Sequence, residues 1–206
     1  MIRAGVAVEG ASPPARAEYA SPPPFARAAR LTRARGATYP HAVMTRPDGA
    51  YRVLIVCTGN TCRSPMAAAA LRRTLGPEAE RVIVESAGTS AGEGHAASDP
   101  SIRIAAASGV DLSGHRSRRV TPELLRAADL VLVMEPAHRA AALALGADPD
   151  RTHLISEWPD PGEPALPLAD PFGGSSEAYE ECWRRIQRHA ERVAPHIREA
   201  ARARSA

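Results

Sequence analysis

Short apolar runs alternate with longer segments of helical pattern from residue 51 to the C-terminus. Uninterrupted runs of Val, Leu and Ile are typical of strands that are buried on both faces. These runs lie at 53–56, 82–84, 130–133 and, more weakly, 153–155. Helices are predicted at 64–75, 99–109, from 121, at 136–145 and from 176 onward. This alternation predicts an α/β fold, a three-layer sandwich with a four-stranded parallel sheet.

Capping residues mark the ends of several predicted helices. Ser64 suits the N-cap and Pro65 the first turn of one helix, and Gly76 follows its last residue. The last helix is rich in Arg and Glu, and we expect this charged face to be solvated. Its apolar stripe, which is expected to pack on the sheet, consists of Ile186, Val193 and Ile197.

The first 50 residues differ from the rest in composition. They are rich in Pro, Ala and Arg, without sustained periodicity, which predicts a disordered leader over 1–50 and a folded domain over 51–206. The proline triplet at 22–24 argues against the amphipathic helix of a transit peptide. An alternative is that Met44 is the true start and the leader is an artefact.

Composition and charge exclude several classes of function. All 26 basic residues are Arg, and the absence of lysine excludes Schiff-base chemistry and a Gly-Lys-Ser/Thr phosphate loop. Residues 1–50 carry a net charge of +4 and residues 51–206 carry −1, so the nearly neutral remainder gives nucleic-acid binding no support. Three cysteines without a disulfide framework indicate a reducing compartment. With no apolar run of membrane-span length, we expect a cytoplasmic protein with no membrane partner.

The motif at 57–65 lies between the first strand and the helix that follows it, where open α/β sheets bind ligands. It reads Cys-Thr-Gly-Asn-Thr-Cys-Arg-Ser-Pro, which predicts a phosphate-binding loop. Five residues between Cys57 and Arg63 suffice to wrap backbone N–H groups around a tetrahedral anion. Gly59 and Asn60 are the residues best able to adopt left-handed conformations. The N-terminus of the helix and the planar fork of Arg63 would bind the same anion.

This arrangement indicates nucleophilic chemistry at Cys57. The positive field would lower the pKa of its thiol, and Ser64 is placed to hydrogen-bond the sulfur. The expected reaction is transfer of a phosphoryl group to cysteine, followed by hydrolysis. A zinc site is disfavoured, because Cys57 and Cys62 have no second Cys/His pair at ligand spacing. We expect no metal and no organic cofactor.

With its Cys-x5-Arg-Ser motif, the sequence resembles the low-molecular-weight protein tyrosine phosphatase family from residue 51 onward. The resemblance implies that Asp170, in Asp-Pro-Phe-Gly-Gly-Ser, is the general acid. Asp160 precedes a competing Asp-Pro in the same loop. His115, in a Gly-His segment, is implied to support the phosphate loop through Asn60. The implied substrate-binding residues are Thr58, Gly59, Asn60, Thr61, Cys62, Ser64 and Phe172.

Two details resemble the bacterial protein arginine phosphatase branch of that family. Thr61 stands where tyrosine phosphatases usually place a bulkier aliphatic residue, and Phe172 stands where they place tyrosine. A threonine hydroxyl accepts a hydrogen bond from a guanidinium, which an aliphatic side chain would leave unpaired. Phe172 would supply a flat wall for either substrate. We therefore expect phosphoarginine in proteins as the substrate, with phosphotyrosine as the alternative and no obligate partner.

Two further classes fit less well. Arsenate reductases on this fold use an additional pair of cysteines, whereas Cys182 stands alone in the last helix. A phosphopeptide-binding module would not need Cys57 or Asp170. Cys62 permits a reversible Cys57–Cys62 disulfide as an off-state, and a small buried residue behind the loop is the equal alternative.

Overall fold

The structure, a computed structural model, describes residues 49–157 and 166–204. The predicted leader up to residue 48, including Met44, lies outside the described residues, as does Asp160. Among the described residues, no helix is long and apolar enough to cross a membrane.

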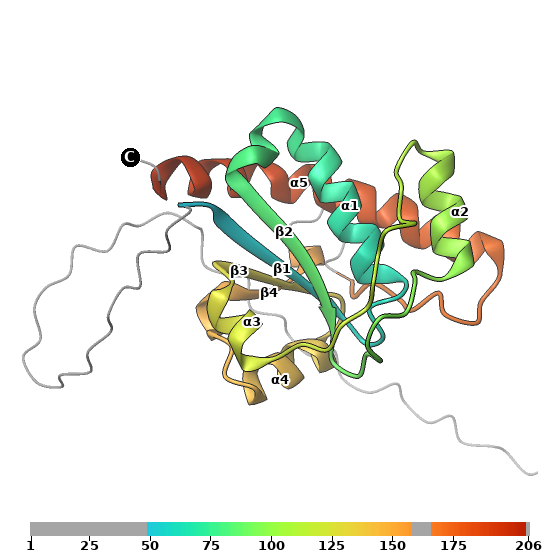
Figure 1. Cartoon of the computed structure of the whole chain (residues 1–206), viewed down its shortest axis with the longest axis horizontal. Helices are drawn as coiled ribbons and strands as arrows, with labels where there is room; N and C mark the ends of the chain where they lie inside the picture. Colours follow the sequence, from blue (N-terminus) through green and yellow to red (C-terminus); the bar gives the residue numbers. More distant parts are fainter. Residues whose placement is uncertain (1–48, 158–165, 205–206) are drawn as a thin grey trace, which may run out of the picture. The chain divides into compact units, whose positions relative to one another are not determined.

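The core of the described part is a four-stranded parallel sheet with strand order β2-β1-β3-β4 (Figure 1). The strands are β1 (Tyr51–Cys57), β2 (Val82–Gly88), β3 (Leu130–Val133) and β4 (Thr152–Leu154). Val56, at the end of β1, pairs with both Ala87 and Val133, so three strands end side by side next to Cys57. The predicted fold class is confirmed.

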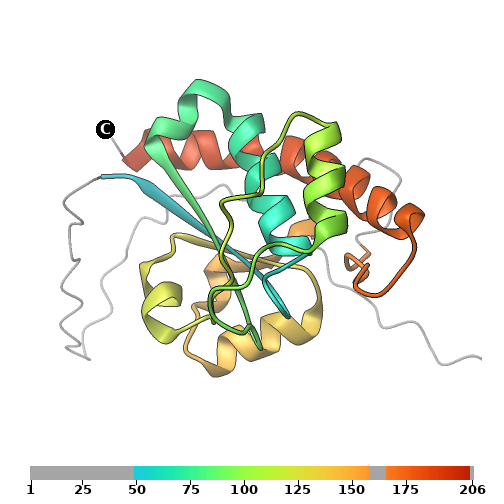
Figure 2. The same ribbon diagram turned by 45° about the vertical axis from the view of Figure 1, so that its right-hand side comes forward.

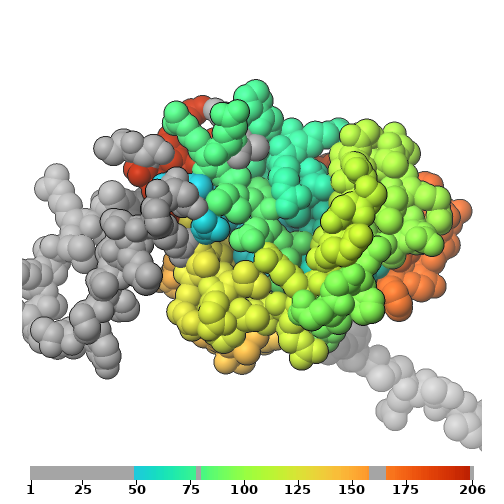
Figure 3. All heavy atoms as spheres, viewed as in Figure 1, coloured from blue at the N-terminus to red at the C-terminus, as the bar shows by residue number. Residues whose placement is uncertain are grey.

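Helices cover both faces of this sheet. They are α1 (Arg63–Leu75), α2 (Asp99–Ala107), α3 (Pro122–Ala127), α4 (Pro136–Ala144) and α5 (Ser176–Arg204). Short 3-10 segments lie at Gly76–Arg81, Pro149–Arg151 and Ile155–Glu157. Figures 1 and 2 show α1, α2 and α5 on one side of the sheet and α3 and α4 on the other. Segment 108–121, yellow-green in Figure 3, runs beside α1 and the end of β2.

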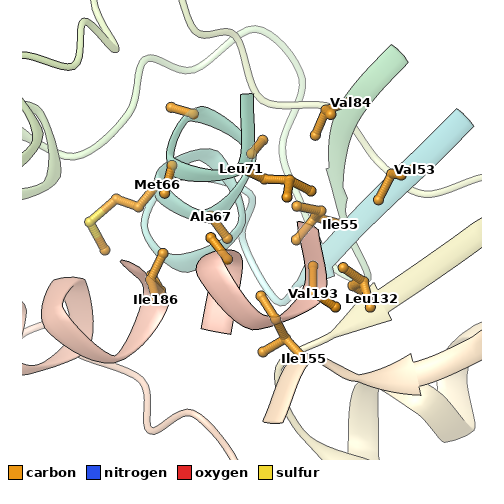
Figure 4. Close-up of a cluster of buried hydrophobic side chains, with 14 of the residues drawn as sticks. Val53, Ile55, Met66, Ala67, Leu71, Val84, Leu132, Ile155, Ile186 and Val193 are labelled. Carbon is orange, nitrogen blue, oxygen red and sulfur yellow. The ribbon is translucent and has the colours of Figure 1, made fainter. Parts of the chain in front are cut away.

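Alternate residues of β1 face two separate apolar cores. Val53 and Ile55 belong to the cluster beneath α1 and α5, whereas Leu54 and Val56 belong to the cluster beneath α3 and α4. The first cluster also contains Met66, Ala67, Leu71, Val84, Leu132, Ile155, Ile186 and Val193 (Figure 4). Burying one such aliphatic side chain stabilises the fold by about 1.5–3 kcal/mol. The continuous apolar run of β1 follows from this double burial.

Element boundaries differ from the predictions in ways the hydrogen bonds explain. Helix α1 begins at Arg63, with Cys62 at the N-cap position. The predicted cap Ser64 instead places its hydroxyl 3.0 Å from the Cys57 sulfur. Strand β2 extends beyond its apolar run to Gly88, because its backbone continues to pair with β1. Smaller shifts end α2 at residue 107 and place β4 at 152–154.

Candidate active site

The loop between β1 and α1 rests against the chain segment that follows β2. The N–H of Thr89 donates to the Cys57 carbonyl at 2.9 Å, and that of Ser90 donates to the Thr58 carbonyl at 2.9 Å. Gly88 lies directly beneath the loop, because a Cβ there would stand 2.4 Å from the Thr58 carbonyl oxygen. The absence of a side chain at Gly88 is therefore a condition for this loop position.

The side chain of Asn60 joins the loop to two distant segments. Its amide nitrogen donates to the hydroxyls of Ser64 and Ser86, each at 2.9 Å. Its side-chain oxygen accepts a hydrogen bond from the backbone N–H of Arg118 at 2.9 Å. Asn60 is fully buried, and these hydrogen bonds replace the ones that its side chain would make with water. Loop, strand β2 and segment 108–121 thus share one hydrogen-bond network.

The backbone of Asn60 adopts the left-handed conformation that the sequence suggested, at φ 54°. Its N–H points to the Cys57 sulfur at 3.2 Å, and its carbonyl accepts a hydrogen bond from Nε2 of His115 at 2.6 Å. The contact implied between His115 and Asn60 is therefore present, through the carbonyl. For Gly59 the expectation was wrong: its φ is not positive, and an added Cβ would make an ordinary contact.

The Cys57 thiol is buried and hydrogen-bonded. Ser64 Oγ lies 3.0 Å from the sulfur. Burial raises the pKa of Cys57, whereas the hydrogen bonds from Ser64 and Asn60 and the charge of Arg63 lower it. Burial is the largest of these effects, so the expectation of a lowered pKa is wrong for this structure.

Two carboxylates hold the Arg63 guanidinium. Nη1 donates to Glu135, and Nη2 donates to Asp170 Oδ2 at 2.6 Å. Nη1 also donates to the Leu168 carbonyl at 3.0 Å, and Nη2 lies 3.4 Å from the Thr58 hydroxyl. Arg63 is buried, with two negative charges offsetting its positive one. This pairing weakens its influence on the Cys57 sulfur.

Asp170, the predicted general acid, is brought to the loop by this ion pair. Its other oxygen accepts a hydrogen bond from the Phe172 N–H at 3.2 Å. The Asp170 side chain is 42% exposed, and Phe172 is 74% exposed. The acid-bearing segment therefore presents a carboxylate and an aromatic ring to solvent beside the loop.

The two threonines of the loop have different surroundings. The hydroxyl of Thr58 lies 2.8 Å from Nε2 of His138. Thr61 is half-buried; its carbonyl accepts from the Ser98 N–H at 2.8 Å, and its hydroxyl lies 3.7 Å from the Cys62 sulfur. Thr61 therefore remains accessible at the loop.

Cys62 lies behind the loop. Its sulfur is 3.3 Å from Ser98 Oγ and 3.5 Å from the Tyr179 hydroxyl. Cys57, Cys62 and Cys182 are all free and buried. These contacts agree with a small packed residue, and the Cys57–Cys62 disulfide stays a prediction.

Sequence reasoning missed several neighbours of the loop. Glu135 and His138 follow β3, and Ser86 and Arg118 hold Asn60. Glu135 did carry a signal, because it comes just after the strand that pairs with β1 at the edge where ligands bind. The partners of Asn60 lie 26 and 58 residues further along the chain, with no local pattern to mark them.

The fold and the loop define a class of protein: an α/β enzyme with a cysteine nucleophile in an anion-binding loop after the first strand. A buried thiol, a helix N-terminus, an arginine and a nearby carboxyl group are what phosphoryl transfer through cysteine requires.

Comparison with known proteins gives the family. The family model "low molecular weight phosphotyrosine protein phosphatase" matches residues 52–203, and the chain belongs to this family. The chain is 36% identical over 146 residues to a probable low molecular weight protein-tyrosine-phosphatase, EpsP, of Ralstonia nicotianae, covering 71% of this chain and 95% of that protein. It is 35% identical over 145 residues to the protein-arginine-phosphatase of Geobacillus stearothermophilus, covering 70% and 94%.

The fold is shared with solved members. The crystal structure of the Erwinia amylovora tyrosine phosphatase AmsI matches with a TM-score of 0.65 at 29% identity, covering 71% of this chain and 93% of that one. The protein is therefore a cysteine-based phosphatase, a hydrolase whose relatives are named as protein-tyrosine or protein-arginine phosphatases.

Proposed function

We propose that the protein hydrolyses phosphoarginine in phosphorylated proteins. The observation that carries this proposal is the pair of part-exposed carboxylates, Glu135 and Asp170, on either side of Arg63. A bound phosphoryl group would replace both carboxylates as the hydrogen-bond partner of the Arg63 guanidinium. A cationic guanidinium on the substrate would pair with them in turn, whereas a phenol ring carries no such charge.

Thr61 supports the same substrate. Its hydroxyl stands at the half-buried surface of the loop and is able to accept a hydrogen bond from the substrate guanidinium. A guanidinium that enters the site without a partner costs free energy, and an aliphatic side chain at this position supplies no partner. Thr61 thus favours phosphoarginine over phosphotyrosine.

In the first step, the Cys57 thiolate attacks phosphorus and the P–N bond to the arginine breaks. Asp170, in its protonated form for this step, gives its proton to the departing nitrogen, and the arginine side chain leaves as a guanidinium cation. Arg63 and the N–H groups of loop 57–63 hold the phosphoryl oxygens while charge develops on them. The product is a cysteinyl-phosphate.

In the second step, water attacks the phosphorus of this intermediate. Asp170, now a carboxylate, accepts a proton from the water, and the S–P bond breaks. Inorganic phosphate leaves, and the Cys57 thiolate is restored, stabilised by Ser64 Oγ and the Asn60 N–H.

Phosphotyrosine is the second candidate. Phe172, with 74% of its surface exposed beside Asp170, offers a flat apolar face against which a phenyl ring would stack. The relative EpsP is named as a tyrosine phosphatase, which supports this alternative.

The deciding experiment measures kcat/KM on a phosphoarginine peptide and on the matched phosphotyrosine peptide. Wild type should prefer phosphoarginine, and Thr61→Ile should reduce or invert the preference by about tenfold or more, because the hydroxyl partner is lost. Thr61→Ser, which keeps the hydroxyl, is the matched control and should retain the preference. A wild-type preference for phosphotyrosine would overturn the proposal.

A further inference from the structure

A groove of about 470 Å³ lies on the other side of the loop network, between α1, the end of β2 and segment 111–118. Figure 3 shows this face, with the yellow-green segment lying beside α1. Its volume is in the range of small-molecule sites. Its lining residues are Pro65, Ala68, Arg72, Glu85, Ser86, Asp111, Leu112, Gly114, His115, Arg116 and Arg118.

Positive charge dominates this groove. Arg72, Arg116 and Arg118 line it against two acids, Glu85 and Asp111. Glu85 is engaged by Arg118, at 3.0 Å. Asp111 accepts the Ser113 N–H at its exposed end of the groove. Three arginines against two acids leave one net positive charge, and Arg72 and Arg116, which are not paired with Glu85 or Asp111 in an ion pair, give the groove its attraction for anions.

These two arginines keep N–H groups for a ligand. Within the described residues, Arg72 uses Nε and Nη2 on the Val84 carbonyl, and Arg116 uses Nη1 on the carbonyls of Ser113 and His115. Nη1 of Arg72 and the Nε and Nη2 groups of Arg116 are not used in these bonds. Such forks bind phosphoryl oxygens in pairs. Pro65, Ala68 and Leu112 supply an apolar surface beside them.

The groove contains the residues that fix the phosphate loop. Ser86, His115 and Arg118 line it, and all three hydrogen-bond Asn60. Burial and the nearby charges of the three arginines lower the pKa of His115, which agrees with a positive field at this place. A ligand in the groove therefore touches the same residues that hold Asn60: Ser86 and His115 through their side chains and Arg118 through its backbone N–H.

We propose that this groove binds the phosphoryl group of a small phosphorylated molecule and that its occupancy changes the rate of the reaction through Asn60. The ligand places its phosphoryl oxygens between Arg72 and Arg116 and its organic part on the apolar surface. The bound anion also favours the positive form of His115, whose Nε2 donates to the Asn60 carbonyl.

The first test is binding, measured by calorimetry with two probes: inorganic phosphate and the methylenephosphonate analogue of AMP, which resists hydrolysis. In wild type the analogue should bind at the groove in addition to any binding at Cys57. Arg116→Gln and Arg72→Gln should each weaken groove binding about tenfold. Arg126→Gln, which removes an exposed charge on α3, is the matched control and should bind as wild type does.

The two probes separate the sources of the phosphoryl group. If the AMP analogue binds more tightly than phosphate, the organic part of the ligand contacts the apolar surface of the groove. Equal binding, equally lost in Arg116→Gln, assigns the groove to free phosphate. Both results support phosphoryl recognition. Unchanged affinity of both probes in Arg116→Gln and Arg72→Gln, with the fold checked by circular dichroism, would overturn the proposal.

The second test is coupling. The analogue should change kcat on an aryl phosphate in wild type and Arg126→Gln and should raise the pKa of His115 in an NMR titration. In the Arg116→Gln variant the analogue should change KM alone, because it then only competes with the substrate at Cys57. An effect on KM alone in wild type would overturn the coupling, and this outcome is independent of whether the natural substrate is phosphoarginine.

Discussion

The two halves of the active site are held in different ways. The nucleophile half, with Cys57, Asn60 and Ser64, is at most 2% exposed and is fixed by hydrogen bonds among buried groups. In the acid half, Asp170 and Phe172 are exposed, and the segment contacts the loop through Arg63, which pairs with the Asp170 carboxylate and donates to the Leu168 carbonyl. One half is positioned by buried hydrogen bonds, and the catalytic carboxylate of the other by an ion pair.

This difference has a consequence for the reaction cycle. A network of buried hydrogen bonds keeps one geometry, because breaking any of its bonds leaves a polar group unsatisfied. An ion pair at a part-exposed carboxylate exchanges readily for another anion. We infer that substrate phosphate replaces Asp170 at Arg63, which frees the carboxyl group to serve the leaving group while the loop stays in place.

The largest expected effect belongs to the nucleophile half. Cys57→Ser should reduce turnover by on the order of 10⁴-fold or more, because the reaction needs the sulfur nucleophile. Phosphate binding, measured by calorimetry, should remain, because the loop N–H groups and Arg63 are unchanged. Retained hydrolysis in this variant would remove Cys57 from the mechanism.

The acid half should show a dependence on the leaving group. Asp170→Ala should lower kcat by about 10²- to 10⁴-fold on phosphoarginine or phosphotyrosine peptides and less on an activated aryl phosphate, whose leaving group needs no proton. Asp160→Ala is the matched control and should behave as wild type. If Asp160→Ala produces this pattern instead, Asp170 is not the acid.

A third variant tests how rigidly the nucleophile half is placed. Gly88→Ala puts a Cβ 2.4 Å from the Thr58 carbonyl, so the loop must shift, and kcat should fall on the order of 10- to 100-fold. Gly114→Ala, where an added Cβ meets open space, should leave kcat unchanged. Equal activity of the two variants would show that the loop tolerates displacement.

The smallest expected effect concerns the ion pairs of Arg63, which connect the nucleophile half and the acid half of the active site. Glu135→Gln removes one of the two carboxylates on Arg63, which strengthens the positive field at Cys57 and should lower the pKa of its thiol. The pH profile of iodoacetamide alkylation should therefore move to lower pH. Glu123→Gln, which removes the acid of an exposed ion pair on α3, is the control and should leave the pH profile unchanged. A shift to higher pH would contradict the role given to Glu135.

Sequence patterns predicted the features that depend on neighbouring residues in the chain. The apolar runs at 53–56 and 130–133 became the central strands, since strands buried on both faces carry such runs. The left-handed residue Asn60 was expected from its residue type. The position of Asp170 beside the loop followed from the resemblance to the phosphatase family.

What escaped prediction depends on contacts between distant segments. The polar end of β2 is a strand through backbone pairing with β1, which its side chains do not reveal. The direction of the Cys57 pKa shift was wrong, because burial of the thiol raises its pKa more than the hydrogen bonds and the charge of Arg63 lower it. Both depend on tertiary neighbours rather than on local sequence.

The most direct test of the mechanism is to trap the intermediate. Asp170→Ala, which lacks the base for the second step, is mixed with an activated aryl phosphate and quenched in acid at successive times. Mass spectrometry of the peptide that contains Cys57 should show one phosphoryl group on that residue. The phosphorylated fraction should rise before the release of free phosphate has finished. A phosphoryl group on any other residue, or none on Cys57 at any time during turnover, would contradict the cysteinyl-phosphate mechanism.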